Sequence, residues 1–411
     1  MQKKQGITPG VDRYPRYRWV VLGIAWFTLM AINFSRGLIP SLAYCLIPEL
    51  DLTEAQFTLL ITGPPLTASL TAIPGGALGD RYGIRSVVAV AAFLAGVSGI
   101  ARAFTPSFSG MFAVVCLFGI STGLAMPNLP KLVSTWFPPR QVGLASGIYV
   151  TALGTGLSLG LLTGPLFGSW KQAFIYTGML ILAIAILWTL LARNAPKGIE
   201  IHRSPITSGI KKGVRSKNIW LAGGMMFINV GLLVALSGNL PNALYSVHHV
   251  DPARAGFISS LFTWGVVAGH FIIPIASDRI GLRKPFIYFC EATSAIFLFF
   301  AWRLSPTPTA QILFLLGGFV HGGVHPLLFA LPAELPEIGH EHVGGASGIV
   351  MSLSSMGGFL IPFVVMSPLI AAGTLKAYTA GFSVILLLLA ATLLVNIFVR
   401  ETGTRSRYRE K

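Results

Sequence analysis

The hexapeptide DRYGIR at residues 80–85 is repeated as DRIGLR at residues 278–283, 198 positions further along the chain. Each copy directly follows a long apolar stretch, and each holds an aspartate, a glycine and two arginines in the same register. A charged turn that recurs half a chain apart between apolar segments indicates a duplicated protein that spans a membrane.

The composition supports a membrane location. Hydrophobic residues make up 53% of the chain and charged residues 11%, whereas soluble domains usually carry about 25% charged residues. A helix needs about 20 mostly apolar residues to cross the hydrocarbon of a bilayer, and the chain contains twelve such stretches. The sequence therefore predicts an all-α membrane protein with twelve transmembrane helices. The expected helices cover residues 18–45, 56–78, 86–105, 108–133, 141–168, 172–192, 218–245, 254–277, 285–302, 309–333, 344–370 and 375–399.

Two further repeats support the duplication. GLASGI at residues 143–148 returns as GGASGI at residues 344–349, and the spacing of Gly119, Gly123 and Pro127 returns as Gly318, Gly322 and Pro326. The stretch between the halves is polar, basic and interrupted by prolines, as in a linker. We therefore expect two pseudo-symmetric six-helix bundles, at residues 1–192 and 218–411, joined by a cytoplasmic linker at residues 193–217.

The positions of the 30 Lys and Arg residues predict the orientation, because cytoplasmic loops retain basic residues. Placing both termini in the cytoplasm puts most of these residues on that side. Only a few then lie in outer loops: Arg102, Lys171, Arg254, Arg303 and Lys376. Loop 334–343 disagrees, since it should be cytoplasmic yet contains Glu334, Glu337 and Glu341 and no basic residue. The prediction is a multi-pass protein of the plasma (inner) membrane.

Other classes of function are not favoured. The net charge of +16 is spread over loop ends rather than gathered on one face, so we expect no nucleic-acid partner. The three cysteines, Cys45, Cys116 and Cys290, lack the spacing of a metal site or a disulfide, and we interpret them as packing residues. The sequence contains no phosphate-binding Gly-Lys-Ser/Thr loop, nucleophilic triad or metal cluster. We therefore expect neither an enzyme nor a bound cofactor or metal.

The decapeptide GALGDRYGIR at residues 76–85 resembles the signature between helices 2 and 3 of the major facilitator superfamily, with a weaker copy between helices 8 and 9. Ile84 stands where that pattern often has a second basic residue. The resemblance covers essentially the whole chain and implies a secondary transporter whose halves rock around a central site.

The resemblance also implies a cytoplasmic gate, with Asp80 facing the start of segment 344–370 and Asp278 facing the start of segment 141–168 beside Arg140. The alternative is that these are merely hydrophilic turns. The expected gate residues are Asp80, Arg81, Gly83, Arg85, Arg140, Asp278, Arg279 and Arg283.

Arg36 is the strongest indication of a substrate class. It lies about 18 residues into the first apolar segment, and no acidic residue of that segment is placed to pair with it. A charged residue inside a bilayer is costly and usually functional, and a guanidinium in a central cavity suits bidentate capture of a carboxylate or similar planar anion. The alternative is a structural arginine that snorkels outward or bonds to carbonyls. Asn33 lies on roughly the same helical face.

The pattern Asn33-Phe34-Ser35-Arg36, followed by Pro40, resembles the first helix of cyanate-permease-like and anion:cation symporter branches, where an arginine at this place is tied to anionic substrates. Residues 131–147 are similar to the helix 4 to 5 region of nitrate/nitrite porters. The paired anion-clamping arginines of that last branch would fall on Ala72 and His270, so we do not predict nitrate exchange of that type.

His321 and His325 lie four residues apart and therefore on one face of segment 309–333, a cavity-lining helix in the superfamily. An imidazole titrates near neutral pH, so this pair is a candidate for carrying a coupling proton or donating to the substrate. The alternative is a neutral histidine bonded to a backbone carbonyl, and a metal site lacks a third ligand. Glu291 is an acid well inside a span, which we interpret as a packing or gating carboxylate or a proton carrier.

Further polar or aromatic residues complete the predicted cavity: Asn128, Tyr149, Asn239, Asn242, Tyr245 and Trp264. The sequence thus predicts a monomeric secondary transporter in the lipid bilayer that moves a small anion, such as a monocarboxylate or cyanate-like ion, together with protons. The alternatives are an exporter of hydrophobic or drug-like compounds and a non-transporting receptor on the same fold.

Overall fold

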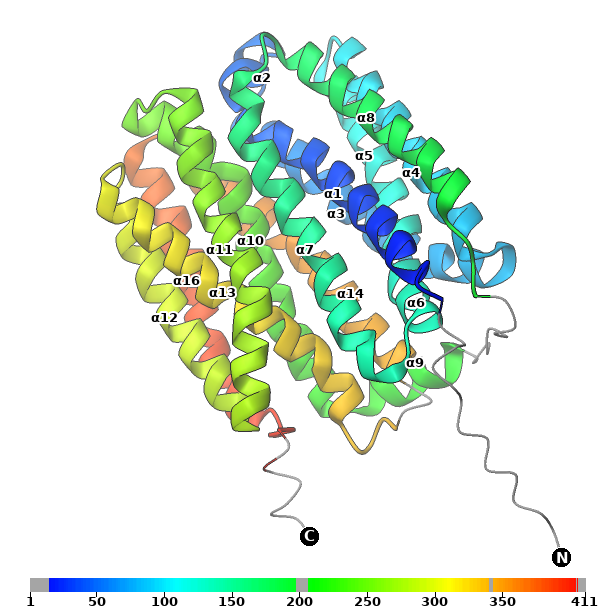
Figure 1. Cartoon of the computed structure of the whole chain (residues 1–411). Coiled ribbons are helices and arrows are strands. Elements are labelled where there is room, and N and C mark those ends of the chain that lie inside the picture. Colours follow the sequence, from blue (N-terminus) through cyan, green and yellow to red (C-terminus); the bar gives the residue numbers. More distant parts are fainter. Residues whose placement is uncertain (1–14, 197–205, 340–342, 404, 406–411) are drawn as a thin grey trace, which may run out of the picture.

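The computed structural model describes residues 15–196, 206–339, 343–403 and 405 (Figure 1). Within these ranges, twelve helices are long and apolar enough to cross a membrane, and none of the described residues is in a β-strand. The twelve-helix, all-α prediction is confirmed.

In the first half of the chain, α1 packs against α7, α3 against α5 and α4 against α8. Two predicted segments are each divided in two. The first segment is α1 followed by α2, and the fourth segment is α5 followed by α6. The break between α5 and α6 lies at Pro127, which lacks an N–H group and interrupts the helix. The elements are α1 (Arg18–Ser41), α2 (Ala43–Glu49), α3 (Glu54–Tyr82), α4 (Ile84–Ala101), η2 (Arg102–Phe104), α5 (Phe108–Ala125), α6 (Asn128–Trp136), α7 (Pro139–Thr163), η3 (Gly164–Leu166) and α8 (Trp170–Leu191).

In the second half, α11 packs against α13, α10 against α14 and α12 against both α13 and α16. The predicted linker contains a helix of its own, α9, which packs on α14. The elements are α9 (Ile206–Arg215), α10 (Lys217–His248), α11 (Pro252–Ile280), α12 (Lys284–Arg303), α13 (Pro308–Glu334), α14 (Val343–Leu360), the π-helical η5 (Ile361–Met366), α15 (Ser367–Ile370) and α16 (Leu375–Phe398).

The repeated sequences have physical roles in this fold. Gly83 and Gly281 turn the chain after α3 and α11 with φ angles of 88° and 76°. Residues other than glycine rarely adopt positive φ angles. Gly119 and Gly318 permit close helix packing. An added Cβ on Gly119 would lie 2.4 Å from the carbonyl oxygen of Pro64 in α3, and on Gly318 it would lie 2.0 Å from that of Phe262 in α11.

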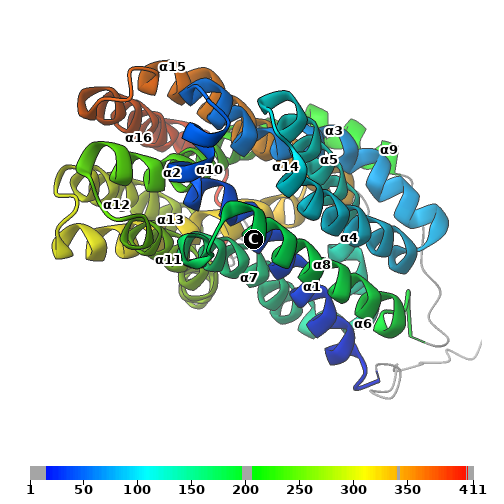
Figure 2. The same ribbon diagram turned by 90° about the horizontal axis from the view of Figure 1, so that it is seen from above.

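The two halves lie side by side, with α7 and α14 running between them (Figure 1). The view from above shows the same two groups (Figure 2). We call the end at which α1 begins and α16 ends the terminal end, and the end that holds α2 the far end.

The halves contact each other closely at the far end. Glu54 of α3 accepts hydrogen bonds from Asn242 of α10 (3.3 Å) and from the hydroxyl of Tyr378 in α16 (3.2 Å). The rings of Tyr44 and Tyr245 also meet across the halves, with centroids 5.9 Å apart. Among the described residues, the side-chain hydrogen bonds that join α1–α8 to α10–α16 all lie in the far half of the membrane span. The structure is therefore closed at the far end.

Candidate functional site

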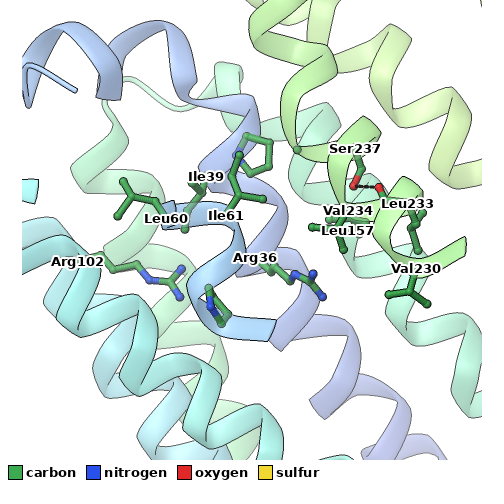
Figure 3. Close-up of a pocket in the computed structure, with 13 residues that line it drawn as sticks. Arg36, Ile39, Leu60, Ile61, Arg102, Leu157, Val230, Leu233, Val234 and Ser237 are labelled. Atoms are coloured by element: carbon green, nitrogen blue, oxygen red, sulfur yellow. Dashed lines mark hydrogen bonds between the residues drawn. The ribbon is translucent and has the colours of Figure 1, made fainter. Parts of the chain in front are cut away.

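A cavity of about 90 Å³ lies between the halves, and Arg36 of α1 is in its wall (Figure 3). One wall is α3, with Leu60, Ile61 and Pro64. The facing wall is α10, which contributes mainly aliphatic side chains. These cavity-lining residues of α10 are Val230, Leu233, Val234, Ser237 and Gly238.

The position of Arg36 follows from how α1 packs. Gly37 and Gly160 bring α1 against α7 so closely that an added Cβ on Gly37 would lie 2.6 Å from the carbonyl oxygen of Leu157. Arg36 lines the cavity from a neighbouring position on α1 and is partly exposed. Within the described part of the chain, no acidic residue lines this cavity and no ion pair or hydrogen bond of the Arg36 side chain is formed. The site thus presents a cation to a mostly apolar space.

A second arginine, Arg102, touches the same cavity. The sequence places it in an outer loop, but in the structure it begins η2 and is fully buried. Its Nη1 donates to both the carbonyl oxygen and the hydroxyl of Ser35, each at 3.3 Å. The guanidinium also lies 4.1 Å from the ring centroid of Phe118. The sequence signal for this burial is weak: Arg102 directly continues an apolar run, with Ala101 before it and Ala103 after it.

The predicted asparagines bond to the backbone. Asn33, Asn128 and Asn239 are buried, and each donates from Nδ2 to the carbonyl oxygen four residues earlier, at 2.8 to 2.9 Å. Asn128 also donates to the Gly75 carbonyl at 3.0 Å, which ties the break between α5 and α6 to α3. These three residues do not line the cavity beside Arg36.

The other polar and aromatic candidates lie apart from this cavity as well. Tyr149 packs against the apolar core of the first half, and Trp264 is half-buried on α11. Asn242 and Tyr245 belong to the contacts that close the far end.

The structure brings three histidines together in the second half. His321 and His325 of α13 have ring centroids 5.0 Å apart, and His270 of α11 lies next to them. The distance from His270 Nε2 to His325 Nδ1 is 3.3 Å. No group of three ligating side chains suited to a metal occurs among the described residues. The cluster can share or pass a proton, since each ring carries both a donor and an acceptor nitrogen when neutral.

Glu291 of α12 lies in the core of the second half. Its Oε1 accepts a hydrogen bond of 3.1 Å from Asn229 of α10, and Thr392 of α16 also bonds to it. The side chain of Glu291 is fully buried, and the His321 ring interacts with the Asn229 backbone. Asn229 therefore connects the carboxyl group to the neighbourhood of the histidines.

The second copy of the repeated turn forms an ion-pair network within its own half. Arg283 pairs with Asp278 at 2.5 Å and with Glu334 at 2.7 Å. Burial opposes the charge of Arg283, but its bonds to Glu334 and the attraction of both carboxylates raise its pKa. Glu401 accepts hydrogen bonds from the backbone N–H groups of Arg283 and Lys284 at 2.8 and 2.9 Å, so it caps α12. Asp278 is thus paired with Arg283, and its predicted contact at the start of α7 beside Arg140 stays a prediction.

The first copy of the turn is arranged in a similar way. The backbone N–H of Arg85 donates to Asn194 at 2.8 Å, as that of Arg283 does to Glu401. Arg81 and Arg279 are exposed, and Arg81 stacks on the ring of Tyr82. The side chains of Asp80 and Arg140 lie outside the described residues.

The network also accounts for the acidic loop that opposed the orientation prediction. Glu334 binds Arg283, and Glu337 accepts hydrogen bonds from Asn218 (2.9 Å) and Ser216 (3.2 Å) at the start of α10. Burial favours the neutral form of Glu337, but these hydrogen bonds outweigh that effect and lower its pKa. The two carboxylates therefore have structural partners. Glu341 lies outside the described residues.

Comparison with known proteins gives the family. The sequence profile of the Major Facilitator Superfamily matches residues 20–241 and 219–411, which together span nearly the entire chain. The chain belongs to this superfamily. The resemblance seen in the repeated turn is thereby confirmed, and the chain is a multi-pass membrane protein. The family consists of transporters rather than enzymes.

The names of several relatives state which substrate those proteins transport. The chain is 26% identical over 381 residues to the probable nitrate/nitrite transporter NarK2 of Mycobacterium tuberculosis, covering 89% of this chain and 92% of the relative. It is 24% identical to the 4-hydroxybenzoate transporter PcaK of Pseudomonas aeruginosa, covering 81% and 82%. It is 25% identical to the hexuronate transporter of Bacillus subtilis, covering 76% and 79%.

Among solved structures, the chain is similar to a bacterial homologue of the human lysosomal transporter Spinster in an inward-facing and occupied conformation. The TM-score is 0.72 at 16% identity, over 93% of this chain and 96% of that one. This likeness shows the superfamily fold.

Proposed function

We propose that this superfamily member is a secondary transporter that carries a small anion by alternating access, with Arg36 as the anion clamp. The observation that carries the proposal is a guanidinium in the cavity between the halves that no acidic side chain of the described residues accompanies. Three relatives support the substrate class, because nitrate, 4-hydroxybenzoate and hexuronate are all anions.

The cavity chemistry favours a monocarboxylate or cyanate-like ion. The planar guanidinium binds two oxygens of a carboxylate in parallel, and a low-dielectric surrounding strengthens such bonds. The aliphatic side chains of Val230, Leu233 and Val234 face an apolar part of the substrate. At roughly 10 to 15 Å³ per water, a cavity of about 90 Å³ holds the volume of several waters, which suits a small ion.

The state of the molecule fits one step of alternating access. The far end is closed by Glu54, Asn242 and Tyr378, so an ion would reach Arg36 from the terminal end. With both termini in the cytoplasm of a plasma-membrane protein, as the basic loops predict, this is an inward-facing state. Opening the far end requires these inter-half hydrogen bonds to break.

Proton coupling is the second part of the proposal. His321, His325 and Glu291 are buried titratable groups in the second half, and Asn229 lies between the carboxyl group and the histidines. Protonation of such groups changes the charge that the second half must bury, which biases it between two conformations.

Binding to the purified protein tests the anion clamp. Nitrate, nitrite, cyanate, propionate and 4-hydroxybenzoate are titrated while thermal stability and heat of binding are measured. We expect at least one anion to stabilise the wild type, and Arg36→Gln to weaken that binding by about tenfold or more, as lost hydrogen bonds to a charged group do. Arg254→Gln is the control, because Arg254 is an exposed arginine outside the cavity. Unchanged binding of every anion by Arg36→Gln contradicts the proposal.

A further inference from the structure

Arg102 is a buried cation that the anion clamp does not explain. Its side chain is fully buried, and within the described residues no acidic group pairs with it. Its Nε and Nη2 atoms are buried without a hydrogen-bond partner in that part of the chain. An unpaired buried charge is normally avoided because removing it from water is costly. We therefore expect an anion from outside the protein to bind near Arg102.

The position of Arg102 identifies where that anion binds. Its Nη1 donates to Ser35, the residue directly before Arg36 on α1. Both arginines contribute to the wall of the same cavity, and the Arg102 guanidinium extends from its helix toward the Arg36 side (Figure 3). The ring centroids of Phe118 and Phe174 lie 4.1 and 5.6 Å from the guanidinium carbon of Arg102, so the two aromatic rings hold the guanidinium in place.

We propose that Arg102 is the second cation of the anion site, which rests on the function proposed for Arg36. Arg36 contacts the ion, and Arg102 lies behind it and adds a fixed positive potential through the low-dielectric wall. As far as the described residues show, the site without substrate then contains two cations and no acidic side chain. A substrate anion relieves this repulsion, whereas a cation or a neutral compound does not.

A purely structural role is the competing explanation. In that case Arg102 serves only to tie η2 to α1 through Ser35. The two explanations differ in what the protein loses when the charge is removed. A structural tie contributes to stability without affecting the affinity for anions. A second cation lowers the stability of the empty protein and raises the affinity for anions.

The test uses Arg102→Gln and Arg102→Met in the full-length protein, with the same five anions as probes. We expect the dissociation constant of the best-bound anion to rise about tenfold or more, in line with losing a charged partner. We also expect the melting temperature of the ligand-free Arg102→Met protein to stay equal or rise. Ser35→Ala is the matched control, since it removes one acceptor of Arg102 and keeps the charge, and it should bind the anion as the wild type does.

Two results overturn the inference. In the first, Arg36→Gln loses anion binding while both Arg102 variants bind like the wild type; Arg102 is then a structural tie and the anion clamp stands. In the second, both Arg102 variants lower the melting temperature of the ligand-free protein and leave the dissociation constant unchanged. If neither variant folds, Arg102→Lys decides, because a lysine keeps the charge near neutral pH and loses it as the pH rises toward about 10, whereas an arginine stays charged. The inference predicts that Arg102→Lys binds the anion like the wild type at about pH 7 and loses affinity more steeply than the wild type toward about pH 10, and the structural tie predicts the same pH dependence for both proteins.

Discussion

The residues that carry charge inside this protein have very different surroundings. Arg36 is partly exposed to a cavity, Arg102 is sealed between aromatic rings and Ser35, and Glu291 is bonded to Asn229. Removing a charged group from water costs free energy unless a bonding partner offsets the loss. For Glu291 the protein provides such a partner in Asn229. For the two arginines the proposed partner is an anion from outside the protein. Under this proposal the substrate binds to the first half, whereas the buried titratable groups His321, His325 and Glu291 lie in the second.

The histidine cluster leads to a prediction about coupling. If His321 and His325 carry the coupling proton, anion uptake becomes faster as the outside becomes more acidic, because each transport cycle then takes up a proton from that side. The double variant His321→Gln, His325→Gln should lose this dependence in uptake measured between about pH 5.5 and 8. His249→Gln is the control, since His249 is exposed at the far end. A double variant that keeps the full pH dependence removes these residues from the proton path.

At the scale of elements, the repeated turn fixes how α3 meets α4 and how α11 meets α12. The glycine supplies the left-handed backbone, and a polar side chain from a distant segment caps the next helix: Asn194 for α4 and Glu401 for α12. The two caps differ chemically but bond to the same backbone position of the repeat. Both copies thus have a glycine with positive φ and a cap on the same backbone N–H, whereas the ψ angle of the glycine (144° at Gly83 and 26° at Gly281) and the capping residue differ.

This geometry predicts a cost for any side chain at Gly83. An added Cβ would lie 2.7 Å from the Asn194 amide, and the φ angle of 88° disfavours alanine. We expect Gly83→Ala to lower the stability by about 1 kcal/mol or more, measured as a lower melting temperature in detergent. Gly224→Ala is the control, since nothing lies within 4 Å of its Cβ position in α10. Equal melting temperatures for the two variants would show that the turn is not strained by a side chain.

At the scale of the whole molecule, a carboxylate at the closed far end bonds to the other half of the chain. Glu54 accepts hydrogen bonds from Asn242 and Tyr378, and Glu49 nearby accepts one of 2.6 Å from Trp170 within the first half. The two glutamates lie at the same end, but only Glu54 joins the halves.

Glu54→Gln is therefore expected to shift the population toward an open far end, because the neutral amide accepts weaker hydrogen bonds than a carboxylate. Pairs of spin labels across the far end, measured by double electron–electron resonance, should report a larger share of long distances. Glu49→Gln should leave the distribution as in the wild type. If Glu54→Gln has the wild-type distribution as well, this contact does not hold the far end closed.

Local sequence patterns predicted the membrane helices, the duplicated turn and the depth of Arg36, because each depends on neighbours along the chain. The burial of Arg102 was not predicted, since it depends on Phe118 and Phe174 from two other helices. His270 likewise meets His325 only through the packing of α11 on α13. The roles of the candidate residues stay predictions, because a charge count along the chain does not reveal which side chains share a cavity.

Transport itself tests the central claim most directly. Wild type, Arg36→Gln and Arg254→Gln are reconstituted into proteoliposomes, and saturable uptake of radiolabelled nitrate, cyanate, propionate and 4-hydroxybenzoate is measured under an inward proton gradient. We expect the wild type and Arg254→Gln to accumulate at least one of these anions, and Arg36→Gln to take it up at least about tenfold more slowly. Equal uptake by Arg36→Gln and the wild type would contradict the anion clamp.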